Sequence, residues 1–220
     1  MKKTILILIL FVLTLTTYSQ KQLVGMNGGI IFSNINTNSD FFTEKTFKTD
    51  WTSNINYERY FTEKISIETG IQYERKGFID YFTYLDENGN EIKKEQIISQ
   101  YEYISIPIGV KYSIGYKFKT FGEIGIIPSY FVNGKIIYPD DIIIISPIPP
   151  LKDLVNRFDL GAFVCFGLSY QIFNKIELNV NGIFNHSLIS MTSVNYFEEY
   201  KIYNYLYSVN IGLKYYLKDE

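Results

Sequence analysis

The sequence contains few of the residues that build metal centres, active sites and covalent cross-links. Its 220 residues include one cysteine and one histidine. A single cysteine cannot form an internal disulfide, and a single histidine argues against a histidine-based metal cluster or catalytic triad. The 21 basic and 23 acidic residues are balanced, which leaves no electrostatic footprint for nucleic acid. We therefore expect a non-enzymatic protein with no catalytic, cofactor-binding or metal-binding residues and no nucleic-acid partner.

The few polar residues that could carry chemistry have simpler interpretations. His186 has no nucleophile and base arranged with it beyond adjacent serines, which is too little to define an active site. Cys165 lies among glycine and serine on one side of a predicted strand, where burial as a small side chain is favoured over reactivity. Asp140 and Asp141 could bind a cation with acidic residues of another loop, but such a pair is usually solvated.

Long hydrophobic runs are also absent, apart from the N-terminus. A helical membrane protein needs several stretches of about 20 apolar residues. Residues 1–20 place two lysines before a short apolar run, and the small residues Thr17 and Ser19 precede Gln20, which is the pattern of an export signal. We predict a signal peptide over residues 1–19 and one barrel domain over residues 20–220. An uncleaved anchor helix is the alternative.

Aromatic residues and strand-like alternation dominate the rest of the chain. Tyr and Phe number 20 and 17. In residues 65–76, Ile65, Ile67 and Ile71 share one face, and Glu68 and Glu74 share the other, as the period of a β-strand requires. The same alternation predicts eight strands, over residues 23–32, 51–61, 65–76, 103–114, 118–132, 158–172, 176–185 and 205–217.

The connections between these strands alternate in length. Residues 62–64, 115–117 and 173–175 are tight turns, whereas residues 33–50, 77–102, 133–157 and 186–204 are long. Short turns at one rim and long loops at the other indicate an up-and-down antiparallel order, with both ends of the domain on the short-turn side.

The two faces of the strands differ in a way that assigns inside and outside. One face is uniformly apolar, and the other mixes small residues with charges of both signs. Eight strands enclose a space just wide enough for side chains, so the mixed face fits the inside and the apolar face fits lipid. We predict an all-β, eight-stranded antiparallel up-and-down transmembrane β-barrel; a soluble lipocalin-like barrel would reverse the faces. The predicted lumen charge network comprises Glu58, Glu68, Glu74, Lys111, Lys119, Glu123, Asp159, Glu177 and Lys214.

One strand carries a family resemblance. Residues 103–112, Tyr-Ile-Ser-Ile-Pro-Ile-Gly-Val-Lys-Tyr, look like the Tyr-x-x-Ile-Pro strand of the Bacteroidota outer-membrane β-barrel family that includes PorT-type proteins. We expect Pro107 to mark a bulge or kink, because proline interrupts a ladder. The resemblance implies a barrel in the outer membrane of a Gram-negative bacterium. Some members of that family are linked to secretion or gliding.

The long loop before the sixth predicted strand is unusually apolar. It contains Ile142, Ile143, Ile144, Ile145 and Ile148 next to several prolines. An apolar extracellular loop held extended by proline could dock a partner. Alternatively, these residues fold back over the barrel mouth.

Three functions follow from this pattern. The first is a non-enzymatic outer-membrane anchor, in contact with outer-membrane lipid, whose long loops bind a surface ligand or another envelope or secretion protein. The second is a narrow transporter or channel for small solutes, and the third is a soluble ligand-binding barrel. None of the three requires a cofactor.

Overall fold

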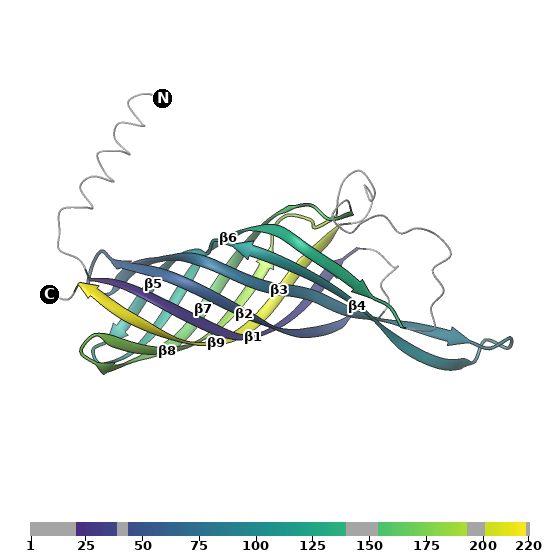
Figure 1. Cartoon of the computed structure of the whole chain (residues 1–220), viewed down its shortest axis with the longest axis horizontal. Coiled ribbons are helices and arrows are strands. Elements are labelled where there is room, and N and C mark those ends of the chain that lie inside the picture. The colour runs from purple at the N-terminus through teal and green to yellow at the C-terminus, as the bar shows by residue number, and fades with distance from the viewer. Residues whose placement is uncertain (1–20, 39–43, 140–153, 193–200, 219–220) are drawn as a thin grey trace, which may run out of the picture.

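A computed structural model describes residues 21–38, 44–139, 154–192 and 201–218, which form an antiparallel β-barrel with a long ribbon projecting from one end (Figure 1). No helix in these residues is long and apolar enough to cross a bilayer. The strands are β1 (Gln22–Thr37), β2 (Thr46–Tyr60), β3 (Ile65–Leu85), β4 (Glu91–Ser105), β5 (Ile108–Gly115), β6 (Phe118–Ile137), β7 (Phe158–Phe173), β8 (Ile176–Ser187) and β9 (Ile202–Lys218).

The sheet closes on itself. β1 pairs antiparallel with β2 on one side and with β9 on the other, so the first and last strands are neighbours. β4 and β5 together form one barrel strand, because each pairs with β3 and with β6. The predicted eight-stranded up-and-down barrel is therefore confirmed.

The interruption between β4 and β5 falls at Pro107, which has no N–H to donate to a ladder. The register to β3 and to β6 is the same on both sides of this break. Of the predicted bulge or kink, the bulge is excluded, since it would shift the pairing by one residue, whereas the interruption of the strand at Pro107 is observed. The shift in this strand lies instead between Glu102 and Tyr103.

The side chains alternate across the wall in the predicted sense. Ile106, at the break between β4 and β5, is 48% exposed on the outside, and Val180 of β8 is 42% exposed. Lys111 and Glu177 point inward and are buried. An apolar outer wall and a polar lumen are the arrangement of a membrane barrel, so the soluble alternative, which needs the opposite arrangement, is wrong.

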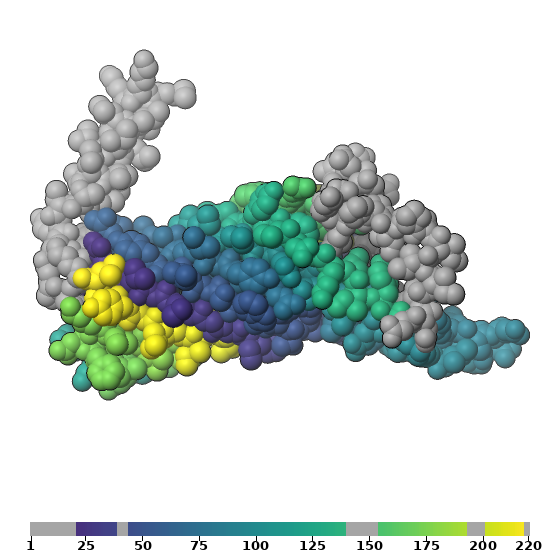
Figure 2. Space-filling model, in the orientation of Figure 1, coloured from purple at the N-terminus to yellow at the C-terminus, as the bar shows by residue number. Residues whose placement is uncertain are grey.

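The strands are longer at one end of the barrel than the sequence predicts. The turns at the other end are short, as expected. Gln22 at the start of β1 pairs with Lys218 at the end of β9, which places the first and last residues of the sheet at the short-turn end. However, most of the predicted loop over residues 77–102 is strand, because β3 continues to Leu85 and β4 begins at Glu91. This hairpin forms the ribbon that projects in Figures 1 and 2. Its alternation is weak because neither face of the hairpin is enclosed by the barrel.

Apolar side chains fill the lumen in three groups. Leu23, Tyr60 and Tyr216 pack together toward the short-turn end. A second group contains Phe121 and Phe163, two aromatic residues that point inward and pack in the lumen. The third group fills the long-strand end and comprises Ile35, Phe78, Tyr101, Tyr103, Phe131, Val155, Met191 and Ile202.

Candidate functional site

Five charged side chains from five strands meet in the lumen, and we call them the central charge cluster. Lys214 donates hydrogen bonds to Glu58 at 2.5 Å and to Glu68 at 2.7 Å. Lys111 donates to Glu58 at 3.2 Å and also to Glu68, and its Nζ lies 3.7 Å from Glu123. Each lysine bridges carboxylates of different strands, so the cluster ties the walls of the barrel together.

A second group lies toward the short-turn end. Lys119 Nζ donates to Glu177 Oε2 at 2.6 Å and to the Tyr216 hydroxyl at 3.1 Å, and the same hydroxyl donates to Glu177. Tyr216 also packs against Leu23 and Tyr60. This ion pair is therefore covered by apolar side chains on the side facing the turns.

A third group lies toward the long-strand end. Lys76 Nζ lies 2.8 Å from Glu74 and 3.6 Å from Asp159. Ser105 donates to Glu74, and Ser187 donates to Asp159, each at 2.8 Å. The sequence prediction omits Lys76 from the network, although its even spacing from Glu74 places it on the same face.

The structure brings the predicted lumen charges together as ion pairs. All nine point inward: Glu58, Glu68, Glu74, Lys111, Lys119, Glu123, Asp159, Glu177 and Lys214. Beside the central charge cluster lies a cavity of about 40 Å³. A cavity of that size has room for one or two water molecules and not for a larger solute. The filled lumen thus does not favour the channel alternative.

The sequence does not predict a further ion-pair group, which lies at the long-strand end. Lys48 donates to Asp50, and Arg75 Nη1 lies 3.3 Å from the same carboxylate. Lys48 and Asp50 fall in the segment expected to be a loop. Only the extension of β2 to Thr46 brings their side chains inward.

The remaining predicted residues have different outcomes. Ile142, Ile143, Ile144, Ile145 and Ile148 lie outside the described residues, as do Asp140 and Asp141, so these predictions stay predictions. Cys165 is buried in the lumen beside Phe163, as expected. His186 lies on the outer wall, where its ring stacks on Tyr203 and Tyr205 at centroid distances of 6.3 and 6.4 Å. This position within an aromatic belt fits a role at the membrane interface.

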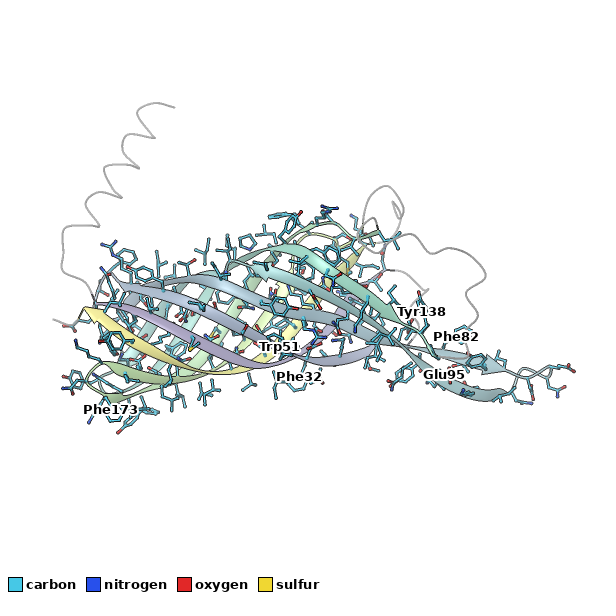
Figure 3. The ribbon with its side chains drawn as sticks, in the orientation of Figure 1. Phe32, Trp51, Phe82, Glu95, Tyr138 and Phe173 are labelled. Atoms are coloured by element: carbon cyan, nitrogen blue, oxygen red, sulfur yellow. The ribbon has the colours of Figure 1, made fainter. Side chains whose placement is uncertain are left out.

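The projecting hairpin, which we call the arm, is formed by residues 80–97. Its two strands pair from Asp80 with Ile97 to Leu85 with Glu91. Among the described residues, pairing of β3 with β2 stops at Ile79 and pairing of β4 with β6 stops at Ile98. As far as the described residues go, the arm is thus a two-stranded ribbon with two open edges. Figure 3 shows Phe82 and Glu95 on it, far from Phe173 at the short-turn end.

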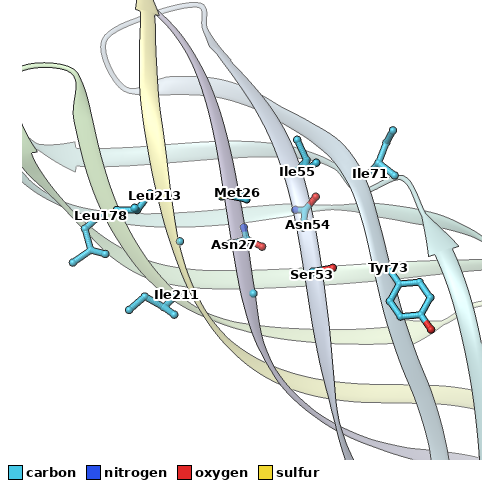
Figure 4. A pocket seen from close by; sticks show the side chains of 12 residues that line it. Met26, Asn27, Ser53, Asn54, Ile55, Ile71, Tyr73, Leu178, Ile211 and Leu213 are labelled. Carbon is cyan, nitrogen blue, oxygen red and sulfur yellow. The ribbon is translucent and has the colours of Figure 1, made fainter.

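The outer wall carries a shallow apolar groove of about 800 Å³ over β1, β2, β3, β8 and β9 (Figure 4). Its lining includes Met26, Ile55 and Ile211, together with Gly28 and Ser53. Most of the lining side chains are those of the lipid-facing wall. This groove is therefore part of the surface that contacts acyl chains.

The chain matches a known family. The outer membrane protein beta-barrel domain family matches residues 18–193. Comparison with curated proteins gives no match. Among solved structures, OprG of Pseudomonas aeruginosa is similar, with a TM-score of 0.50 and 11% identity over 91% of this chain and 96% of that chain. The outer membrane protease OmpT of Escherichia coli is similar with a TM-score of 0.48 and 11% identity, over 92% of this chain and 100% of that chain. Ail of Yersinia pestis is similar with a TM-score of 0.41 and 10% identity, over 88% of this chain and 99% of that chain.

The family match and the OprG structure agree with the architecture. The family match spans most of the chain, and the similarity to OprG supports the barrel fold. The narrower resemblance to PorT-type proteins of Bacteroidota stays a prediction. The chain belongs to the outer membrane protein beta-barrel domain family and is an outer-membrane protein of a Gram-negative bacterium.

Proposed function

We propose that this protein is a non-enzymatic surface anchor whose arm binds an extended segment of another envelope or secretion protein by strand addition. The observation that carries the proposal is the open edge of β3 over residues 80–85, which we call the β3 edge. An open edge presents unpaired N–H and C=O groups, which a strand from another chain can pair with. In the usual orientation of outer-membrane barrels, short turns face the periplasm, so the arm faces the cell exterior.

The two edges of the arm differ in how well they resist pairing. The β4 edge, residues 91–97, carries Glu91, Lys93, Lys94 and Glu95. Charges of this kind are a common guard against unwanted strand addition. The β3 edge has one charge, Asp80, followed by Tyr-Phe-Thr-Tyr-Leu, a run of high β-propensity. A partner strand is therefore expected on β3 rather than on β4.

The arm has internal contacts that hold it extended. The rings of Phe82 and Tyr84 meet edge to face at 5.0 Å on one side of the ribbon. On the other side, Lys94 lies 5.1 Å from the centre of the Tyr81 ring and forms an ion pair with Glu44 of the β1–β2 connection. Two-stranded hairpins alone are marginal in water, so these contacts and the barrel root preorganise the arm for binding.

A matched pair of proline variants tests the proposal. Thr83→Pro removes a backbone donor from β3, and Gln96→Pro removes one from β4, at neighbouring positions of the same ribbon. Outer-membrane and secreted proteins that co-purify with the unaltered protein from its native bacterium would be compared with those recovered with each variant. We expect at least a tenfold loss with Thr83→Pro and little change with Gln96→Pro.

Folding is checked separately by heat-modifiable migration on detergent gels, which both variants should retain because the arm lies outside the barrel. Equal recovery with both proline variants would contradict strand addition on the arm. Loss with Gln96→Pro alone would contradict the assignment to the β3 edge. A third variant, Ile142, Ile143, Ile144 and Ile145 replaced by serine, asks whether the apolar loop also contributes.

A further inference from the structure

The cavity beside the central charge cluster has a mixed lining. Glu68, Lys111 and Glu123 form its charged side, and Cys165 and Phe163 lie on its apolar side. Asparagine side chains from other strands complete it. The cavity is thus enclosed by strands that are far apart in sequence, within the part of the barrel that crosses the membrane.

The central charge cluster holds more carboxylates than ammonium groups. Within the part of the chain that the structure describes, Glu58, Glu68 and Glu123 form ion pairs with Lys111 and Lys214 alone. Both lysines bond to Glu58 and Glu68, whereas the single ion-pair contact of Glu123 is at 3.7 Å, from Lys111. Glu123 is therefore the least compensated carboxylate of the cluster. An uncompensated charge in such a buried site is very costly.

The cavity is also lined by hydrogen-bond acceptors that have no partner. Asn210, which is 4% exposed, uses its Nδ2 to donate to Asn181 Oδ1 at 3.0 Å and to Ser208 Oγ at 3.1 Å. In this arrangement Asn210 Oδ1 has no hydrogen-bond partner. Asn54 Oδ1, which lines the same cavity, has no partner either. Buried acceptors of this kind are normally satisfied, often by internal water.

We propose that this cavity is a binding site for water and for one proton, and that Glu123 holds the proton. A neutral Glu123 leaves two carboxylates and two ammonium groups, so the cluster is balanced. The Glu123 hydroxyl and one or two waters then supply donors to the unpartnered acceptors, including Asn210 Oδ1. The charge surplus and the unpartnered acceptors are independent observations, and one bound proton with water resolves both.

The proposal predicts how stability depends on pH. The groups around Glu123 come from every neighbouring strand: Glu58 of β2, Glu68 of β3, Lys111 of β5, Cys165 of β7 and Lys214 of β9. An unfolded glutamate is ionised at neutral pH, so the folded barrel binds one proton more than the unfolded chain. Stability therefore falls as the pH is raised until Glu123 loses this proton.

Infrared spectroscopy of the full-length protein folded in lipid vesicles tests the proposal. A band from a protonated carboxyl group at neutral pH should appear in the difference between the unaltered protein and Glu123→Gln. It should be absent from the difference with the control Glu177→Gln, because Glu177 is fully paired with Lys119 and Tyr216. The urea midpoint of the unaltered protein should fall as the pH is raised, and that of Glu123→Gln should stay level.

Two measurements keep the proposal testable if Glu123→Gln does not fold. The carboxyl band of the unaltered protein should disappear as the pH is raised. The S–H band of Cys165, the only cysteine in the sequence and the residue opposite Glu123 in the β6–β7 pairing, should shift in the same pH range. No carboxyl band would overturn the proposal. Stability that follows the sodium or potassium concentration in place of the pH would also overturn it, because a cation would then occupy the cavity.

Discussion

Strands β3 and β4 belong to both the barrel and the arm, yet their edges and their charged side chains have opposite surroundings in the two regions. In the barrel, β3 has a neighbour on both sides; beyond Ile79, β4 is its only partner in the described residues. In the lumen, Lys111 is 3% exposed and pairs with several carboxylates. On the arm, Lys94 and Glu44 pair with side chains 41% and 50% exposed. Both are pairs of a lysine with a glutamate. The burial that follows from closure of the sheet therefore decides how much each ion pair contributes to stability.

The largest expected effect comes from removing a lumen lysine. Lys111→Met leaves Glu58, Glu68 and Glu123 with Lys214 as their only lysine in the cluster. Breaking a buried ion pair by removing one partner costs about 3–5 kcal/mol. We expect a drop of that order in the free energy of unfolding, or failure to fold, measured by urea titration in detergent.

The matched change on the arm is Lys94→Met, which breaks its exposed ion pair with Glu44. Exposed pairs contribute little because water and salt screen them. The unfolding curve of the barrel should not change. Equal effects of the two methionine variants would show that burial does not separate the barrel from the arm.

A charge on the outer wall should have the next largest effect. Ile124 lies near the middle of β6 on the lipid-facing side and is 65% exposed there. Ile124→Lys should destabilise the barrel in lipid vesicles by about 2–4 kcal/mol, the cost of a lysine near the bilayer midplane. Ile92 is exposed to a similar extent, at 68%, but lies on the arm. Ile92→Lys should leave stability unchanged, and a large loss there would place the arm in lipid.

The smallest effect concerns the tip of the arm. Asp86 accepts hydrogen bonds from the Asn90 side chain and from the amides of Asn88 and Asn90, and these bonds lower its pKa below the ordinary 3.8. A carboxyl group with a lowered pKa stabilises the fold above its ordinary pKa and loses this contribution as the pH falls through the lowered value. We expect amide exchange at Gly89 to accelerate at acid pH, relative to a neighbouring barrel amide, while the barrel stays folded.

Asp86→Ala is the control for the tip. The Gly89 amide, which donates to the Asp86 carbonyl at 3.0 Å, should then exchange rapidly at every pH. A pH-dependent exchange rate that persists in Asp86→Ala would assign the effect to another group.

The sequence was a good guide to the barrel and a poor guide to the arm. Alternation placed Glu58, Lys111 and Lys214 in the lumen correctly, because one face of the barrel wall meets lipid and the other faces the polar lumen. It failed from Gly77 onward. Residues 76–78 are all buried, which interrupts the alternation, and over the arm both faces meet water, so apolar and polar residues no longer alternate. The same failure left Lys48 and Asp50 in a predicted loop, although both lie in β2.

The sequence by itself determined the number of barrel strands, the side on which each residue lies and the end at which the turns are short. These properties depend on the two-residue period of a strand and on the length of each connection, which are local. Only the tertiary structure decided which charged side chains pair, such as Lys214 with Glu58, which are 156 positions apart in the sequence. It alone showed that Glu123 has a single ion-pair contact, at 3.7 Å, and that in the described residues β3 has an open edge. Pairing across a closed barrel depends on register and curvature, which are set by all strands together.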